Sequence, residues 1–408
     1  MASPAAAQTT WNNAGSGSWF TSSNWSPAVT PAATTNVTIN NGGTAQVTAA
    51  GAVARSVVLG AALGQSGNLE ITGPGTLVVA TSFPAFLVGN FGTGTVTISG
   101  GGTLSTTLVS AIGNQIGSFG KVTITGAGSV WNEFSSVDIG SSGEGELHIL
   151  AGGKFGTTSA ATIFVGNDNG AEGIVYVTGN GSNLRVSAAN IGAAAGGTGE
   201  VQVSGSGAGF TATGTVNVAA AGTSGTGAST SGKLLLDNSA TGTFQGLSIG
   251  NVAGGTGEVK LQNNAALTVT NAASIGVGGT GTLLISSGAD LTSAGGTIGV
   301  NGTTGGTQGS GTVSVDGLGS SWLMGSSALR MGESSGNNGT WPGGGASLSV
   351  LNGAQVGAGS LTGIHSSTTY GSSSITIGGL GSDGTTRAKL TITNAVILTA
   401  RAGEFNLN

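Results

Sequence analysis

Side chains that could perform acid–base chemistry are few in this sequence and far apart. Its 408 residues include only two histidines, His148 and His365, which lie in distant parts of the chain. Hydrolytic catalysis needs two titratable groups that face one bond. Glu144 and Glu146, in the segment "GEGE" (143–146), are adjacent carboxylates of this kind. We favour a solvated corner over a catalytic pair, because nothing nearby in the sequence completes a catalytic set.

A second candidate is a calcium site in the segment "GNDNGAEG" (166–173). Asn167, Asp168, Asn169 and Glu172 supply the oxygen ligands that calcium prefers, and backbone carbonyls would add to them. The segment lacks the nonapeptide repeat of calcium-binding β-rolls. We therefore expect a turn here and no bound metal.

The segment "GESSG" (332–336) matches the G-x-S-x-G pattern of serine hydrolases. A chain rich in Gly and Ser produces this pattern by chance, and no strand–turn–helix pattern surrounds it. Phosphate loops, dinucleotide-binding fingerprints and zinc spacings do not occur in the sequence. We assign no catalytic, cofactor-binding or metal-ligating residue, and we expect that the protein is not an enzyme and needs no cofactor.

Charge and cysteine content exclude several other classes of protein. Charged residues make up 6% of the chain, the formal net charge is −5, and cysteine is absent. The sequence contains no basic stripe, so nucleic acid is not an expected partner. Disulfides and thiolate metal sites are ruled out. The start lacks the apolar stretch of a signal peptide, although "SPAAAQ" fits the small-residue end of one that has been cleaved.

A repeat organises the chain. Short apolar segments that end in glycine, such as "FLVG" (86–89), "VDIG" (137–140) and "LSIG" (247–250), recur roughly every 23–29 residues, the length of one solenoid coil. A second segment then alternates apolar and polar residues. Its apolar pairs are Leu69/Ile71, Val96/Ile98, Val122/Ile124, Leu147/Ile149, Val175/Val177, Val201/Val203, Leu234/Leu236, Val259/Leu261, Leu283/Ile285, Val313/Val315, Leu348/Val350, Ile375/Ile377 and Leu390/Ile392. A third segment carries one large residue, which is Leu104, Trp131, Phe155, Leu184, Phe210, Phe244, Leu267, Leu291 or Trp322 in successive coils.

Three strands and three turns per repeat predict an all-β fold, a right-handed parallel β-helix of about 13 coils of three short strands. Alternation sends one set of side chains into the core, where like residues stack at ~4.8 Å. The handedness follows from the crossover preference of parallel strands. A β-propeller would need about 40 or more residues per blade, and a β-sandwich gives no reason for so regular a repeat.

The ends of the chain differ from its middle. Residues 1–35 contain Trp11, Trp19 and Trp25, which we interpret as a cap over the open first coil, with sugar stacking as the alternative. We assign 36–331 to the regular β-helix, 332–374 to an irregular coil with loop insertions, and 375–408 to the last coils. Loop insertions are the usual place for binding residues.

One register position also carries alternating charge. The residues that open the second strand are Thr95, Lys121, Glu146, Ile174, Glu200, Lys233, Glu258, Thr282 and Thr312. In an in-register stack, Lys121 would face Glu146, and Lys233 would lie between Glu200 and Glu258. We interpret these charges as control of strand register and not as catalytic groups.

Several motifs resemble a known family. The segments that carry the resemblance are "GSWFTSSNWSP" (17–27, after Trp11), "NVTINNGG" (36–43), "VGNFGTGTVTISGGGTL" (88–104), "IGNQIGSFGKVTITGAGSVW" (112–131) and "GLGSSW" (317–322). The resemblance is to the repeat of type V secretion (autotransporter) passengers and PEP-CTERM-associated surface proteins. The resemblance covers nearly the whole chain. It implies a secreted bacterial β-helix at the cell surface, and a translocator barrel in the outer membrane that these 408 residues do not contain.

Two classes of function fit these observations. The first is an adhesive structural protein that associates through its polar flank with itself, a host or abiotic surface, or a glycan, as in cell–cell adhesion or a biofilm. The second is a carbohydrate-binding or polysaccharide-degrading β-helix with its site in the 332–374 loops. Low charge favours the first class, because an enzyme acting on acidic polymers needs a basic cleft. Ice binding would require a regular Thr array, which His148, Tyr176 and Lys260 interrupt.

Overall fold

The computed structural model is nearly all β, with about 12 turns of a parallel β-solenoid. The predicted fold class is therefore confirmed, and the predicted number of about 13 coils is close to the observed number. It describes residues 6–80, 84–158, 161–220, 230–299, 309–332, 345–362, 373–378, 389–397 and 404–407. Two compact units divide the chain: unit 1 is 1–189 with 197–200, and unit 2 is 190–196 with 201–408. Among the described residues, no helix is long and apolar enough to cross a membrane.

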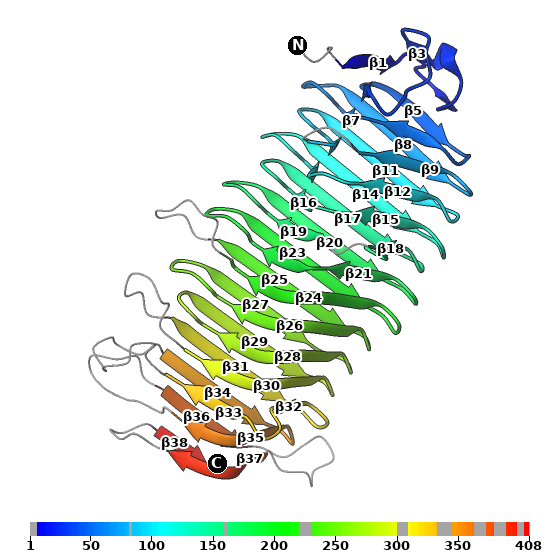
Figure 1. Ribbon diagram of the computed structural model, residues 1–408. Coiled ribbons are helices and arrows are strands. Elements are labelled where there is room, and N and C mark those ends of the chain that lie inside the picture. The colour runs from blue at the N-terminus through cyan, green and yellow to red at the C-terminus, as the bar shows by residue number, and fades with distance from the viewer. Residues whose placement is uncertain are drawn as a thin grey trace, which may run out of the picture. The chain divides into compact units, whose positions relative to one another are not determined.

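Unit 1 repeats one long strand and two short strands per coil. A representative coil has β11 (Thr93–Ser99), β12 (Thr103–Thr106) and β13 (Ser110–Ile112). The long strands pair in parallel and in register, and β8, β11, β14 and β17 lie side by side in Figure 1. We call the sheet of long strands sheet B. The short strands form sheet A.

The other elements of unit 1 are β1 (Ala7–Trp11), β2 (Ser16–Ser18), η1 (Ser22–Asn24), β3 (Trp25–Ser26), β4 (Thr35–Ile39), β5 (Asn41–Val47), β6 (Ala52–Ala54), β7 (Ser56–Leu59), β8 (Ser66–Thr72), β9 (Thr76–Val79), β10 (Phe86–Val88), β14 (Phe119–Thr125), β15 (Val130–Glu133), β16 (Ser136–Ile139), β17 (Glu144–Leu150), β18 (Lys154–Phe155), β19 (Thr162–Val165), β20 (Glu172–Thr178) and β21 (Asn183–Val186). The chain continues with β22 (Ala188–Ile191) and β23 (Thr198–Ser204).

In much of unit 2 the two short strands join into one. Its elements are β24 (Gly209–Val218), β25 (Ser231–Asp237), β26 (Thr241–Ile249), β27 (Thr256–Leu261), β28 (Ala266–Ile275), β29 (Thr280–Ser286), β30 (Asp290–Ile298), β31 (Ser310–Asp316), β32 (Ser321–Leu323), β33 (Ala328–Met331), β34 (Gly345–Leu351), β35 (Gln355–Thr362), β36 (Ser373–Gly378), β37 (Lys389–Ile397) and β38 (Glu404–Leu407). The register between β26 and β28 shifts at Phe244/Leu247. A bulge therefore bends the joined strand where unit 1 has a separate turn.

Alternation in the long strands produces the core as predicted. Every predicted pair from Leu69/Ile71 to Leu348/Val350 is at most 1% exposed. The residues between the pairs, such as Thr97, Thr123 and Ser314, are half-buried and face outward. The first inward-facing residue of most long strands is a glycine, because the backbone of a neighbouring strand lies too close there for a side chain. A Cβ on Gly120 would overlap the carbonyl oxygen of Val88.

The large residues that were predicted for the third segment of each coil are all buried. Among them, Leu104, Trp131 and Phe155 stack in register. One assignment in this column was wrong. Phe244 is buried, but Gly242 is the residue that pairs with Phe210 and Leu267. The Phe244 ring, two residues later, contacts the Phe210 ring at a centroid distance of 4.8 Å. The side chains of Leu267 and Leu236 lie closest to the position that a Cβ on Gly242 would take, at 2.6 and 2.9 Å, and the Phe244 ring follows at 3.5 Å.

The first coil is built around tryptophan. Trp11, Trp19 and Trp25 are at most 1% exposed, and Trp25 lies edge-on to the other two rings at 4.8 and 4.9 Å. β1 pairs in parallel with β4, and β3 pairs antiparallel with β1. The three rings therefore lie in the interior, and the interpretation of residues 1–35 as a cap stays a prediction. Rings so deeply buried do not present a face to a sugar.

The last coil differs from the predicted alignment. β38, with Phe405 and Leu407, pairs with Ile375 and Ile377 of β36 in sheet B. β37, which contains the predicted pair Leu390/Ile392, pairs instead with β35 in sheet A. The alternation of β37 was assigned to the wrong sheet, because both kinds of strand alternate here and the repeat spacing is irregular.

Candidate functional surface

One group of charged side chains in unit 1 lies on the outward face of sheet B. β14, β17 and β20 are adjacent, and their in-register outward positions bring together Lys121, Glu146, His148 and Tyr176. Lys121 and Glu146 are register partners, as are His148 and Tyr176. We call these four residues the β17 cluster. The sequence prediction that Lys121 faces Glu146 is confirmed.

Glu146 is the centre of the β17 cluster. Its Oε2 lies 2.9 Å from Lys121 Nζ and 3.0 Å from His148 Nε2. Partial burial alone would raise the Glu146 pKa, but the hydrogen bond and charge of Lys121, with His148, outweigh burial and hold this pKa below its usual value. Burial, and then the Lys121 charge, lower the pKa of His148. The His148 and Tyr176 rings meet edge-on at 4.8 Å.

These protonation states limit the chemistry of the β17 cluster. With a lowered pKa, Glu146 is ionised at neutral pH and does not serve as the proton donor that glycoside hydrolysis requires. Glu144 and Glu146 lie within β17 and not at a corner, so the interpretation of "GEGE" as a corner was wrong. Glu144 is exposed and pairs in register with Glu172 of β20. The arrangement suits polar contacts with a partner surface.

The register prediction holds in unit 2 for the pairs that the structure describes. Lys233 of β25 pairs with Glu258 of β27, which pairs with Thr282 of β29. The predicted neighbourhood of Lys233 and Glu200 stays a prediction.

In the turn at 166–171, two of the four candidate oxygen ligands have other hydrogen-bond partners. Asn167 hydrogen-bonds Asp138. Asp168 accepts hydrogen bonds from the Asn169 backbone N–H at 2.8 Å and from the Ser142 hydroxyl at 3.1 Å. Within the described residues there is no group of three or more His, Cys, Asp or Glu side chains placed to hold a metal.

A buried carboxylate that the sequence analysis missed lies in the core of unit 1. Glu133 is 0% exposed, and its Oε2 accepts hydrogen bonds of 2.6 Å from the hydroxyls of Thr106 and Ser110. Its Oε1 accepts from the backbone N–H groups of Phe134 and Ser135 at 3.1 and 3.0 Å. Burial raises the pKa of Glu133 to about 7, although these four hydrogen bonds oppose the shift. Alternation from the inward Trp131 places Glu133 inward too, and this signal was available in the sequence.

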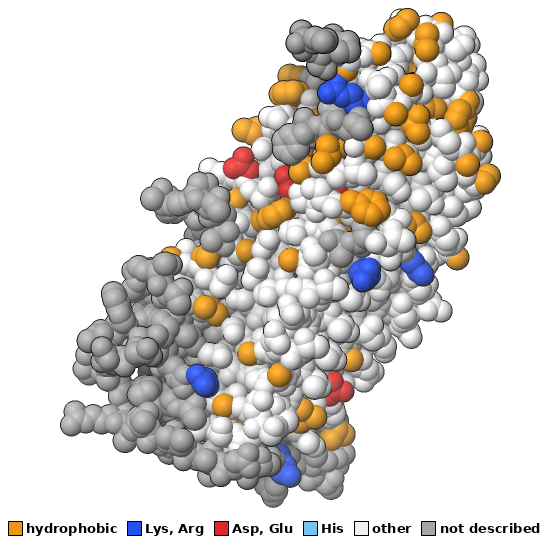
Figure 2. Space-filling model, in the orientation of Figure 1, with side chains coloured by type: hydrophobic (Ala, Val, Ile, Leu, Met, Phe, Trp, Pro, Cys, Tyr) orange, Lys and Arg blue, Asp and Glu red, His pale blue; other side chains and the backbone are white. Residues whose placement is uncertain are grey.

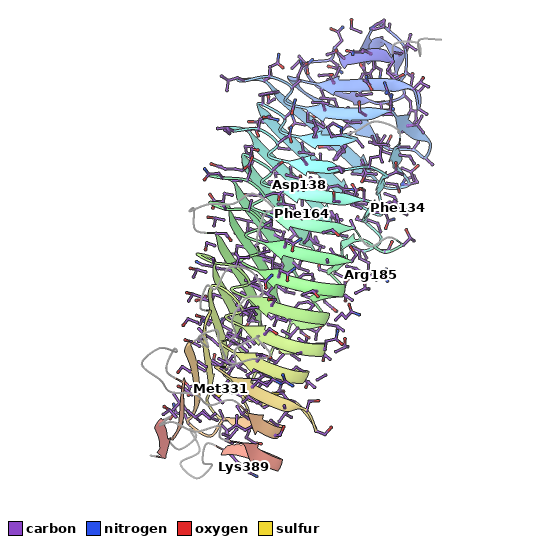
Figure 3. The ribbon with its side chains drawn as sticks, turned by 60° about the vertical axis from the view of Figure 1, so that its left-hand side comes forward. Phe134, Asp138, Phe164, Arg185, Met331 and Lys389 are labelled. Carbon is purple, nitrogen blue, oxygen red and sulfur yellow. The ribbon has the colours of Figure 1, made fainter. Side chains whose placement is uncertain are left out.

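A second acid has a raised pKa on the outward face of sheet A. Asp138 pairs with Phe164 on the adjacent strand, and the two side chains are neighbours in Figure 3. Burial raises the Asp138 pKa to about 6, and the hydrogen bond with Asn167 partly offsets this. Asn167, which contacts the Asp138 carboxyl group, is an amide that does not transfer protons, so we assign Asp138 no chemical role.

The remaining candidates lie outside the described residues. They are His365, Ser334 and Ser335 of "GESSG", and much of the 332–374 segment in which a carbohydrate site was predicted. Within that segment, the structure describes β34 and β35, which continue sheets B and A by pairing with β31 and β32.

This chain resembles known proteins only weakly. No protein-family model matches this sequence, and no curated protein matches it. One solved structure, a TibC-catalyzed hyper-glycosylated fragment of TibA, is similar with a TM-score of 0.44 and 15% sequence identity. The match covers 98% of this chain and 94% of that one.

Proposed function

We propose that this protein is a secreted or surface-exposed bacterial β-helix that acts as an adhesive, self-associating structural protein. The observation that carries the proposal is the outward face of sheet B. Its central row is half-buried in each unit and is mainly polar: Glu70, Thr97, Thr123, His148 and Tyr176 in unit 1, and Leu235, Lys260, Leu284, Ser314, Ser349 and Thr376 in unit 2.

Such a face suits many weak contacts. Hydroxyl and amide groups form hydrogen bonds across polar interfaces, and few of these side chains carry charge that would repel a second copy. Charged side chains are also few on the face of unit 1 that Figure 2 shows, which is not the outward face of sheet B. Each contact contributes little, so useful adhesion comes from many copies on a cell. The resemblance to autotransporter passengers and PEP-CTERM-associated proteins also supports a location at the cell surface.

Paired lysine substitutions within one coil test this proposal. Thr95→Lys/Thr97→Lys places two positive charges on the outward face of β11, while Thr103→Lys/Ser105→Lys places two on the outward face of β12. We expect the first variant to disperse cells that display the protein and to weaken self-association in sedimentation at high concentration. The second variant is the matched control and should behave like the wild type.

Two results would contradict the proposal. One is a wild-type protein that stays monomeric at high concentration and leaves displaying cells dispersed. The other is an equal effect of the two lysine variants, which would mean that sheet B has no special role in association.

A further inference from the structure

Three large apolar side chains project into solvent from successive turns at one corner of unit 1. Leu63 is 85% exposed, Phe91 47% and Ile116 83%. They lie in the turns that lead from sheet A into sheet B, between β7 and β8, β10 and β11, and β13 and β14. Backbone hydrogen bonds join these turns, from Phe91 N–H to the carbonyl of Gly60 and from Asn114 N–H to that of Gly89. We call the three side chains the corner triad.

The three turns alternate in length. Residues 60–65 and 113–118 form long turns, each closed by a β-turn with a hydrogen bond from Gln65 N–H to Ala62 and from Ser118 N–H to Gln115. Gly64 and Gly117 have φ of +75° and +76° at the third position of these β-turns, as type II turns require. Leu63 and Ile116 occupy the second position, at the tip. The short turn 89–92 lies between them, which explains why Phe91 is less exposed.

Polar side chains flank the corner triad on two sides. On one side, Asn40 donates a hydrogen bond to Gln65 Oε1 at 3.0 Å. On the other side, the turns of the next two coils are joined by the hydrogen bond from Ser142 to Asp168. The turns that carry the triad, 60–65, 89–92 and 113–118, contain no charged residue. An apolar centre with a polar rim is the usual composition of a protein–protein contact.

We propose that the corner triad is a contact surface for a second copy of this chain, related by a two-fold axis. This inference rests on the proposed self-association and names its apolar contact. The tip of each Ile116 turn would lie over the shorter Phe91 turn of the other copy, so that each projection meets a recess. A two-fold arrangement requires a self-complementary patch, and a projection adjacent to a recess on one surface is of that kind.

The size of the triad suits a weak contact. Its three side chains expose on the order of 400 Å² together, against the ~800 Å² per partner that a stable interface buries. The triad alone would therefore not hold a permanent dimer. It would contribute to an association that depends on many copies at a surface, with the polar face of sheet B supplying the remaining contacts.

Because the chain contains no cysteine, single introduced cysteines can test this geometry. A mixture of Phe91→Cys and Ile116→Cys proteins should form a mixed disulfide under mild oxidation, faster than either pairs with the control Phe134→Cys. Phe134 is 54% exposed in the turn after β15, outside the triad. Separately, Leu63→Ser/Ile116→Ser should weaken association in sedimentation about tenfold, whereas Phe134→Ser should leave it unchanged.

Several outcomes would overturn this inference. Cross-linking that is equally fast through Phe134→Cys would show random collision. Clumping and association that survive Leu63→Ser/Ile116→Ser but are lost in Thr95→Lys/Thr97→Lys would refute the triad contact and leave the proposed function intact. Binding of the monomer to phosphatidylcholine vesicles, lost only in the triad variant, would assign the corner to a lipid surface.

Discussion

The hydroxyl of Thr106 links two buried side chains: it donates a 2.6 Å hydrogen bond to Glu133 and accepts one of 2.7 Å from the Trp131 indole. Thr106 and Glu133 are register partners on β12 and β15, and both are 0% exposed. Ser110 on β13 completes the group. A buried carboxylate with all its hydrogen-bond partners in place fixes adjacent coils to one another, whereas removing one partner leaves a costly unpaired group.

We predict that Glu133 makes stability depend on pH. Its pKa is about 7 in the folded protein, against an ordinary value of 4.5, so the folded state binds the proton more tightly. The resulting stabilisation is fully present below pH 4.5 and is lost as the pH rises to about 7. The loss in unfolding free energy is on the order of 3 kcal/mol. Urea denaturation across this range measures it, and Glu133→Gln should remove this component of the slope. A slope unchanged in Glu133→Gln would refute the assignment.

Core aromatic residues should dominate stability. Phe155→Ala and Phe210→Ala each remove a ring that is at most 1% exposed, and each should cost about 3–5 kcal/mol of unfolding free energy. Phe134→Ala removes a ring that is 54% exposed and should change stability by no more than about 0.5 kcal/mol. Chemical denaturation compares the three variants. Equal costs for Phe134 and Phe155 would contradict this packing.

Two glycines on either side of the start of β14 should respond very differently to alanine. Gly117 has φ of +76° and open space around it, so Gly117→Ala costs only the backbone strain, about 1–2 kcal/mol. Gly120 faces inward, and a Cβ there would overlap the Val88 carbonyl oxygen and lie 2.8 Å from Ile112 Cγ2. We expect Gly120→Ala to cost about 3 kcal/mol or more. Thermal unfolding measures the two costs. Equal stability of the two variants would contradict the close approach of Gly120 to the Val88 backbone.

Replacing Lys121 with glutamate should destabilise the protein in a salt-dependent way. Lys121→Glu puts two carboxylates in register at the β17 cluster, where the wild type has a 2.9 Å ion pair. An exposed pair contributes only ~0.2–1 kcal/mol, and salt screens the repulsion, so the melting temperature should fall more at low salt than at high salt. Lys233→Glu, opposite Glu258, should behave in the same way. The neutral Lys121→Met is the control, and its melting temperature should depend less on salt.

The repeating part of the fold could be predicted because its physical causes are local. Alternation of residues such as Val96 and Ile98 defines an inward face, glycine permits the corners, and one register then repeats from coil to coil. Where the spacing varies, the same reasoning fails. Gly242 occupies the register position at which a large residue was expected, and β37 alternates just as a strand of the other sheet would.

The sequence by itself determined which side chains of the regular long strands face the core, and how Lys121 and Glu146 pair. Only the tertiary structure decided which side chains of adjacent coils are neighbours where the turns of those coils differ in length. It placed the hydroxyls of Thr106 and Ser110 against Glu133 and the Trp131 indole against Thr106. It also aligned Leu63, Phe91 and Ile116 at one corner. The physical reason is that the exposure of a side chain in a turn depends on how far the turns of the adjacent coils project. The sequence around each of the residues 63, 91 and 116 does not contain that information.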